Sequence, residues 1–306
     1  MVDVKEIAEK IYLIDDQLYS IPKWGSVYLI DEVKKALIDT GPTTSANTVL
    51  EGLKQVGVRP EDMDYLIVTH VHLDHAGGAG FLLKGMPQAQ VVVHHKGAKY
   101  LVNPEKLVGS VMATQGEEAM AKLGEVVPLE SEQIKPVNEN DELRLSENQV
   151  LKFIDAPGHA PHELCIYESR NNGLFSGDAI GISVAENKVL LPLTPPPSFD
   201  LALYLDTLER LMVLQVKIIY FAHFGASNKA RGNLQQARDR LQVWAEIGAK
   251  AAETGFDSAV KKLKTQMYTE LEPVRKMESL YKYLTEELVP MNVAGYLKYY
   301  QGKYKL

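Results

Sequence analysis

Four residues that can bind a metal ion lie within six positions of the sequence. They are His70, His72, Asp74 and His75, in the segment THVHLDHAGG. Imidazole nitrogens and carboxylate oxygens are ligands that suit zinc, and also iron or manganese. The segment follows an apolar, β-branched run at 63–68 and precedes a glycine-softened helix start at 76–83, which predicts a strand-to-helix loop. Because reactive groups of α/β proteins gather on such loops, the spacing indicates a metal site.

Three more candidate ligands follow later strand-like segments. His159 comes after 150–154, Asp178 comes after 173–176, and His223 comes after 217–221. Each is flanked by small residues, which let a loop approach a cation closely. Any one of them alone could be a satisfied polar residue. Four strand ends that carry the same kind of residue predict one site built from separate loops.

The order and rough spacing of these seven residues resemble the metallo-β-lactamase superfamily in its binuclear hydrolase form, over about residues 10–228. The resemblance implies an α+β fold, a four-layer αββα sandwich with the metals between the edges of two sheets. It implies that one metal is held by His70, His72 and His159, the other by Asp74, His75 and His223, and that Asp178 bridges both. Two divalent metal ions are therefore expected, zinc first, with iron or manganese as alternatives because such sites accept all three.

The function that this resemblance implies is metal-dependent hydrolysis of a small ester, lactone or thioester. Two cations roughly 3.5–4 Å apart lower the pKa of a bridging water and create a hydroxide at neutral pH. Asp74 is the expected catalytic residue, since its carboxylate can both ligate a metal and orient the hydroxide. The chain has no G-x-S-x-G serine, and Cys165 lies in an apolar stretch typical of a buried residue, so no protein nucleophile is expected.

Two further residues are candidate substrate contacts. Trp24 lies on a hairpin-like loop at 21–25, of the kind that often covers substrate in this superfamily. His162 follows the ligand His159 by three positions and either contacts substrate or supports a ligand. The lactonase branch commonly has a tyrosine three residues after the bridging aspartate. Gly181 occupies that position here, which weakens an assignment to homoserine-lactone cleavage.

Other activities of the same fold remain as alternatives. An iron-dependent oxidoreductase is the first, either flavodiiron-like or persulfide dioxygenase-like. Flavodiiron relatives have a glutamate where this chain has His72 and carry an added flavin domain. Persulfide dioxygenases bind a single iron, whereas the seven-ligand set of this chain favours two metals. A nuclease is disfavoured by the net charge of −7 without a basic block. A binding protein that keeps its metals for stability alone is the last alternative.

The elements that position these residues follow from apolar periodicity. Strands are expected at 10–14, 26–30, 35–39, 63–68, 90–94, 142–145, 150–154, 163–168, 173–176 and 217–221, and helices at 45–57, 97–102 and 200–214. Beyond about Asn228 the strand signals vanish and helical spacing dominates. We therefore predict a catalytic domain at 1–228 and a helical C-terminal extension at 229–306, which either caps the active site or forms a homodimer contact.

Composition limits the class of protein. The 306 residues are 45% hydrophobic and 24% charged, as in an ordinary globular protein, and no apolar run reaches the length of a membrane helix. The first residues lack the basic start and apolar core of a secretory signal, and a single cysteine suits a reducing compartment. We therefore expect a cytoplasmic protein with a small-molecule substrate and without nucleic-acid or membrane partners.

Overall fold

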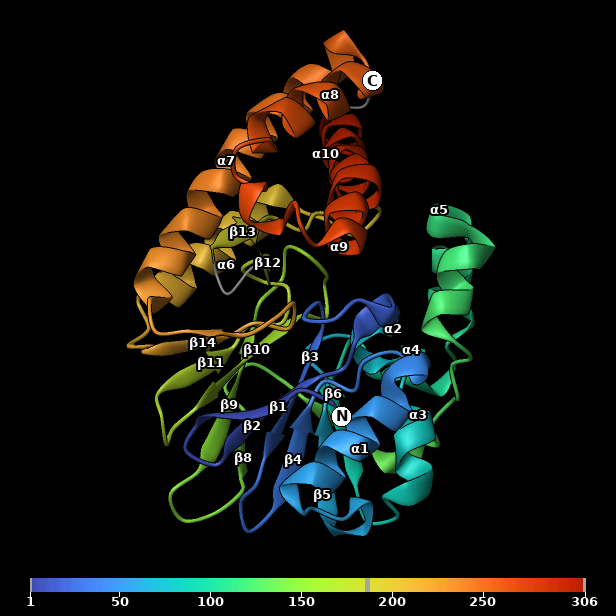
Figure 1. Cartoon of the computed structure of the whole chain (residues 1–306), viewed down its shortest axis with the longest axis vertical. Helices are drawn as coiled ribbons and strands as arrows, with labels where there is room; N and C mark the ends of the chain where they lie inside the picture. The colour runs from blue at the N-terminus through green and yellow to red at the C-terminus, as the bar shows by residue number, and fades with distance from the viewer. Residues whose placement is uncertain (1, 185–187, 305–306) are drawn as a thin grey trace.

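A computed structural model describes residues 2–184 and 188–304 (Figure 1). The strands are β1 Val4–Ala8, β2 Ile11–Asp15, β3 Ser26–Ile30, β4 Lys35–Ile38, β5 Met63–Ile67, β6 Gln90–His94, β7 Ile134–Val137, β8 Glu142–Arg144, β9 Val150–Asp155, β10 Leu164–Glu168, β11 Gly173–Phe175, β12 Ile182–Val184, β13 Val189–Leu191, β14 Ile218–Tyr220 and β15 Ala226–Ser227. The helices are α1 Ala46–Val56, α2 Leu73–Ala76, α3 Ala79–Leu82, α4 Ala98–Val102, α5 Glu105–Leu123, α6 Leu201–Met212, α7 Ala230–Thr254, α8 Phe256–Met267, α9 Glu278–Tyr283 and α10 Val289–Tyr304.

The strands form two large sheets. One has the order β1-β2-β3-β4-β5-β6-β7, and the other has the order β15-β14-β11-β10-β9-β8. In the first sheet, β4 to β7 run parallel, whereas β1 to β4 are antiparallel. Strands β12 and β13 form a separate hairpin. Because β4 and β5 are parallel neighbours, the loops that follow them lie at the same edge of the first sheet.

Alternating side chains divide the interior into three hydrophobic clusters. On β3, Val27 and Leu29 pack with α1, whereas Tyr28 and Ile30 face the second sheet, as the twofold period of a strand requires. The third cluster lies on the outer face of the second sheet and includes residues of α6 and α7. Helix, sheet, sheet and helix are therefore stacked in four layers, which confirms the predicted αββα sandwich.

Several elements were not predicted from sequence periodicity. Strands β1 and β7 are the two edges of the first sheet; β1 has no buried residue and includes Lys5 and Glu6, while β7 contains Pro136. Edge strands tolerate both features, so their apolar signal is weak. Helix α5 buries only Leu123 along its 19 residues, so it lacks the apolar stripe by which a helix is recognised.

The C-terminal helices pack onto the sandwich as the third cluster continues into them. Helix α10 is anchored by Asn292, which is fully buried and whose amide nitrogen donates to the carbonyl oxygen of Pro192. The backbone N–H of Thr194 donates to the same side chain's Oδ1 at 2.5 Å. The division into 1–228 and 229–306 and the homodimer contact stay predictions. In the described residues, no helix combines the length and apolarity needed to cross a bilayer.

Candidate metal centre

The first predicted ligands lie where β5 leads into α2. His70 follows the strand, His72 is the residue just before α2, and Asp74 and His75 lie on that helix. Asp39 follows the neighbouring strand β4 and reaches this loop. It accepts a hydrogen bond from the Thr69 N–H at 2.7 Å, and its Oδ2 lies 3.0 Å from Nδ1 of His75. Asp39 therefore holds the ring of His75 with Nε2 directed away from β4.

The second sheet contributes the other three predicted residues. His159 follows β9, Asp178 follows β11 and His223 follows β14. Because β11 and β14 are paired in parallel, Asp178 and His223 leave the same edge of the sheet. His159 is oriented by a 3.1 Å contact between its Nδ1 and the carbonyl oxygen of Leu193. All three side chains are buried.

The first group of converging side chains is His70, His72 and His159. The Nε2 atoms of His70 and His159 lie 3.0 Å and 2.9 Å from Nδ1 of His72. One ligand atom from each residue lies within 4.8 Å of the other two. Three imidazole nitrogens gathered this closely form a donor set that one cation can occupy.

The second group is Asp74, His75 and His223, which also lies within 4.8 Å. Oδ2 of Asp74 is 3.5 Å from Nε2 of His75 and 3.7 Å from Nε2 of His223. The carboxylate of Asp74 is partly open, with 23% side-chain exposure, whereas the two histidines are buried. The second donor set contains a carboxylate, that of Asp74, whereas the first contains imidazole rings alone.

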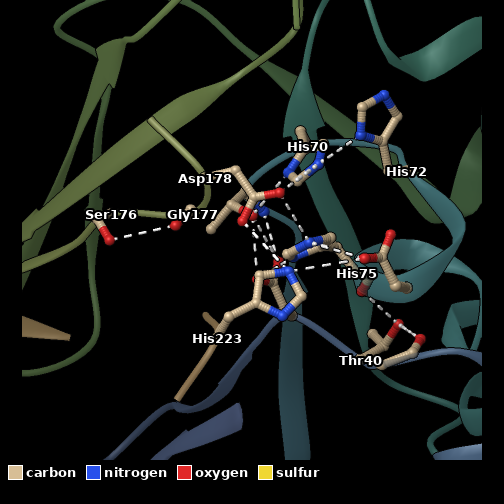
Figure 2. A network of polar contacts seen from close by, with 12 residues as sticks. Thr40, His70, His72, His75, Ser176, Gly177, Asp178 and His223 are labelled. Carbon is tan, nitrogen blue, oxygen red and sulfur yellow. Dashed lines mark hydrogen bonds and ion pairs between the residues drawn. The ribbon is translucent and has the colours of Figure 1, made fainter. Parts of the chain in front are cut away.

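Asp178 lies between the two groups, as Figure 2 shows. Its Oδ2 is 3.4 Å from Nε2 of both His75 and His159, and its Oδ1 is 3.5 Å from Nε2 of His223. The structure thus brings all seven predicted residues together, with Asp178 in the position predicted for a bridge.

The protonation states of His70, His72 and Asp178 suit a metal site. At His75, burial lowers the pKa, but the carboxylates of Asp178, Asp74 and Asp39 outweigh burial and raise that pKa well above its usual value, so a metal must displace a proton there. Burial and the neighbouring His75 lower the pKa of His70 well below its usual value, and burial with His159 does the same for His72. Both rings are therefore neutral at pH 7, as metal ligands must be. Burial raises the pKa of Asp178, but His75, His223 and His159 together outweigh burial and hold it well below the ordinary value. Its carboxylate is ionised.

Unpartnered atoms give a direct test of fit. Nε2 of His75 and Oδ1 of Asp178 are buried without a hydrogen-bond partner in the described part of the chain. Leaving such groups unsatisfied costs about 1–3 kcal/mol each. Both atoms face the space between the two groups, so a bound cation would satisfy them. The residues present therefore fit the two metal ions that the sequence predicts.

Glu163 is a supporting residue that sequence reasoning did not single out. Its Oε1 accepts the N–H of Asp178 at 2.8 Å, and its Oε2 lies 3.4 Å from Nδ1 of His70. Gly177, at φ 50°, is required beside it because a Cβ there would lie 2.2 Å from that Oε1. The small residue therefore makes room for Glu163, not for a cation. Asp39 could have been found as another polar strand end; Glu163, at a strand start, shows no such signal.

A cavity of about 360 Å³ opens onto the metal centre. Trp24 and His162, the two predicted substrate contacts, both line it. The Trp24 ring centroid lies 4.8 Å from that of His223 and 5.2 Å from that of Tyr283, a residue of α9. The indole N–H of Trp24 and Nδ1 of His162 are buried and have no hydrogen-bond partner among the described residues. The C-terminal helices therefore contribute to the wall of this cavity.

Comparison with known proteins places these features in a family context. Residues 24–223 match the sequence model of the metallo-beta-lactamase superfamily. The metallo-beta-lactamase fold-containing protein ST1585 of Sulfurisphaera tokodaii is 30% identical over 200 residues, which are 63% of this chain and 74% of that protein. Flavo-diiron protein FprA2 of Clostridium acetobutylicum is 28% identical over 57% of this chain, and the match spans only 38% of that longer protein. An N-acyl homoserine lactonase of Bacillus cereus is 26% identical over 69% of this chain and 84% of the lactonase.

Solved structures extend the similarity to the C-terminal helices. ST1585 from Sulfolobus tokodaii superimposes with a TM-score of 0.64 at 26% identity, over 75% of this chain and 85% of that chain. The family protein TTHA1429 from Thermus thermophilus superimposes with a TM-score of 0.69 at 19% identity, over 97% of this chain and 95% of its own. The second superposition shows a shared fold that includes the C-terminal region.

Proposed function

The chain belongs to the metallo-beta-lactamase superfamily, and from that premise we propose that it is a metal-dependent hydrolase of a small ester, lactone or thioester. The observation that carries the proposal is the convergence of seven ligand side chains from separate loops at the base of one cavity. The similarity to a lactonase supports hydrolysis of a carbonyl substrate. A cytoplasmic location and a small-molecule substrate belong to the same proposal.

We assign His70, His72 and His159 to one divalent cation, Asp74, His75 and His223 to a second, and Asp178 to both. Zinc is the metal that we expect, with iron or manganese as alternatives. When bound, such a pair supplies a hydroxide nucleophile at neutral pH and polarises the carbonyl group. The residues around it must then hold the substrate and handle the proton.

Asp74 is the acidic group best placed to act on a proton. Its side chain is 23% exposed toward the cavity, whereas that of Asp178 is only 2% exposed. Its Oδ2 can accept a proton from water or orient it. The indole N–H of Trp24 and the ring of His162 are donors for a substrate oxygen; burial, with His159 and His94, lowers the pKa of His162 to about 3, so that ring is neutral. A neutral donor binds a carbonyl group without adding charge beside the metals.

Metal quantification on protein purified without added metal tests the first part of the proposal. We expect two divalent ions per chain, and we expect the reloaded protein to hydrolyse at least one member of a panel of esters, lactones and thioesters. Two bound ions without hydrolysis of any member would instead support a binding protein that uses its metals for stability.

The substitution Asp74→Asn tests the catalytic assignment. Loss of a proton-handling carboxylate typically costs 10²–10⁴-fold in rate, so we expect kcat to fall by about 100-fold or more. The free energy of unfolding should change little, because Asp74 is partly exposed. Rate assays and metal content are measured on the same sample. Near-normal activity with normal metal content would contradict the assignment.

An iron-dependent oxidoreductase is the second candidate, and the similarity to FprA2 is the observation that favours it. His72 contacts His70 and His159 in the first ligand group, at the position where flavodiiron relatives have a glutamate, and a histidine ligand there is the first observation; the similarity to a lactonase is the second. Both observations favour the hydrolase. Iron as the native metal together with oxygen or persulfide consumption would reverse that preference.

A further inference from the structure

A second cavity of about 590 Å³ adjoins the metal-site cavity. Six residues line both, and they are Thr114, Gln115, Pro195, Pro196, Tyr283 and Met291. Because the two cavities share these lining residues, they lie side by side, and we name the second cavity the outer cleft. Both volumes lie in the range that accepts drug-sized ligands.

One wall of the outer cleft is α5. This helix stands apart from α9 and α10 in Figure 1, and its φ of 83° at Gly116 breaks it midway. Leu107 and Val111 face the metal-site cavity, and Ala119 faces the outer cleft. These three side chains are half-buried and stay partly open to the two cavities.

The opposite wall is the start of α10. Pro290, Met291 and Ala294 line the outer cleft. Phe256 of α8 also lines it and is 40% exposed. The wall is held in place by Asn292, which is buried against the loop at 192–194. The outer cleft therefore has one wall that is fixed in position and is lined by apolar side chains of α10.

The charges on the outer cleft identify which kind of group it accepts. Among the described residues, Lys122 is its single lining cation, and its Nζ lies 3.2 Å from the carboxylate of Glu118, which neutralises it. The remaining charged lining residue is Glu287, an anion. The two lining anions, Glu118 and Glu287, outnumber the single lining cation, so the described lining disfavours a phosphate or carboxylate and suits a neutral apolar group.

We propose that the substrate carries a linear apolar chain, such as the acyl chain of an ester or thioester, that lies in the outer cleft while its carbonyl group faces the metal ligands. This inference rests on the proposed hydrolase function for its reaction but on the cleft alone for its binding. Burial of methylene groups then contributes to affinity, and α5 gains an apolar partner.

A chain-length series tests the proposal on the full-length, metal-loaded protein. The substrates are p-nitrophenyl esters from acetate to dodecanoate, below their aggregation limits. We expect kcat/KM to rise about two- to fourfold for each added methylene over several carbons, and then to level off. Ala294→Trp, which fills the outer cleft, should reduce the ratio of long-ester to acetate kcat/KM by about tenfold or more.

Two further variants keep the test decisive. Ala119→Trp blocks the cleft from α5 and gives the same expected loss if Ala294→Trp fails to fold. Val213→Trp adds the same bulk at a 75% exposed position outside the cleft and should keep the chain-length profile of the unmodified protein. An unchanged profile in both cleft variants, or hydrolysis with no dependence on chain length, overturns the proposal and leaves the hydrolase function standing.

A binding measurement separates this inference from the proposed function. Calorimetric titration with acetate, octanoate and dodecanoate needs no turnover. Dodecanoate that binds at least about tenfold more tightly than acetate, with the advantage lost in Ala294→Trp, supports the cleft even when no ester, lactone or thioester is hydrolysed. Equal affinity for the three acids overturns it.

Discussion

At the scale of single residues, Trp24 lies between the candidate metal centre and the C-terminal helices. It is 1% exposed, its ring contacts His223 of the metal centre and Tyr283 of the C-terminal helices, and its N–H has no partner among the described groups. A buried donor without a partner is costly, and we predict that a substrate oxygen accepts this N–H and recovers that cost.

Trp24→Phe should therefore raise KM and lower kcat/KM by about fivefold to tenfold, the equivalent of one hydrogen bond of about 1–1.4 kcal/mol. Metal content should be unchanged. Trp244→Phe is the matched control, because Trp244 is 3% exposed and lies in the hydrophobic cluster of α7. Steady-state kinetics on the best ester of the panel measures both. Equal effects of the two substitutions would remove Trp24 from the substrate site.

Asp16 is a second residue with a specific consequence. A Cβ on Gly25 would lie 2.3 Å from Oδ1 of Asp16, and a Cβ on Gly41 would lie 2.5 Å from its Oδ2. The carboxyl group of Asp16 is therefore packed between these two backbone segments. Burial is the largest influence and raises its pKa to about 7. The folded protein therefore holds a proton on Asp16 between pH 4 and 7 that the unfolded chain releases. This stabilisation is complete below the ordinary pKa and is lost as the pH rises through 7.

Asp16→Asn cannot ionise and should remove that pH dependence. The difference in unfolding free energy between pH 5 and pH 8 should shrink by about 2.5 kcal/mol relative to the unmodified protein. Denaturant unfolding at the two pH values measures it on metal-free samples. Asp206→Asn removes an exposed carboxylate of α6 and controls for the change in net charge. An unaltered pH difference in Asp16→Asn would show that Asp16 is ionised in the fold at pH 5.

At the scale of elements, the contact of α10 with the loop at 192–195 decides where the cleft wall lies. A Cβ on Gly295 would lie 1.6 Å from the carbonyl oxygen of Thr194. Helix α10 can therefore approach the loop this closely only with glycine at position 295. Asn292, three residues earlier on the same helix, is hydrogen-bonded to that loop. Close approach and buried hydrogen bonding thus fix the position of α10.

Gly295→Ala should push α10 off the loop. Overpacking of this kind costs about 1–3 kcal/mol or more, and we expect a lower Tm together with reduced preference for long-chain esters. Gly302→Ala on the same helix has no atom within 4 Å of its new Cβ and should leave stability unchanged or raise it by up to about 1 kcal/mol. Thermal unfolding compares the two. Equal Tm values would mean that α10 does not need this close contact.

At the scale of the whole molecule, the metal centre connects the two sheets. Its ligands come from loops of both, and buried donor atoms there have no partner in the described chain. A metal that binds the folded state and not the unfolded chain would stabilise the whole sandwich to a degree that grows with the excess of metal over its Kd.

Chelation should lower the Tm and abolish hydrolysis, and restoring the metal should reverse both. At roughly a thousandfold excess over Kd the expected stabilisation is about 4 kcal/mol per site. His159→Ala removes a ligand of the first group only and should reduce metal content from two ions toward one. Calorimetry and elemental analysis measure the two effects. A Tm that chelation leaves unchanged would show that the ligand clusters bind no stabilising ion.

Much of the metal centre could be predicted from the sequence because its signal is local. His70, Asp178 and His223 are each recognisable by residue type and by position after an apolar strand, and the order of strands then indicates the fold. The αββα sandwich follows from the same local periodicity together with the family resemblance. Strands β1 and β7 and helix α5 were missed because they bury few apolar side chains.

The tertiary structure alone decided how Asp39 and Glu163 support the ligands, how Trp24 meets Tyr283, and how α5 and α10 frame the outer cleft. These contacts join residues that lie far apart in the chain, such as Trp24 and Tyr283. Periodicity reports which face of an element is apolar, but it does not report which distant element covers that face. The candidate ligand set could therefore be predicted from the sequence, whereas the shape of the space in front of it depends on long-range packing.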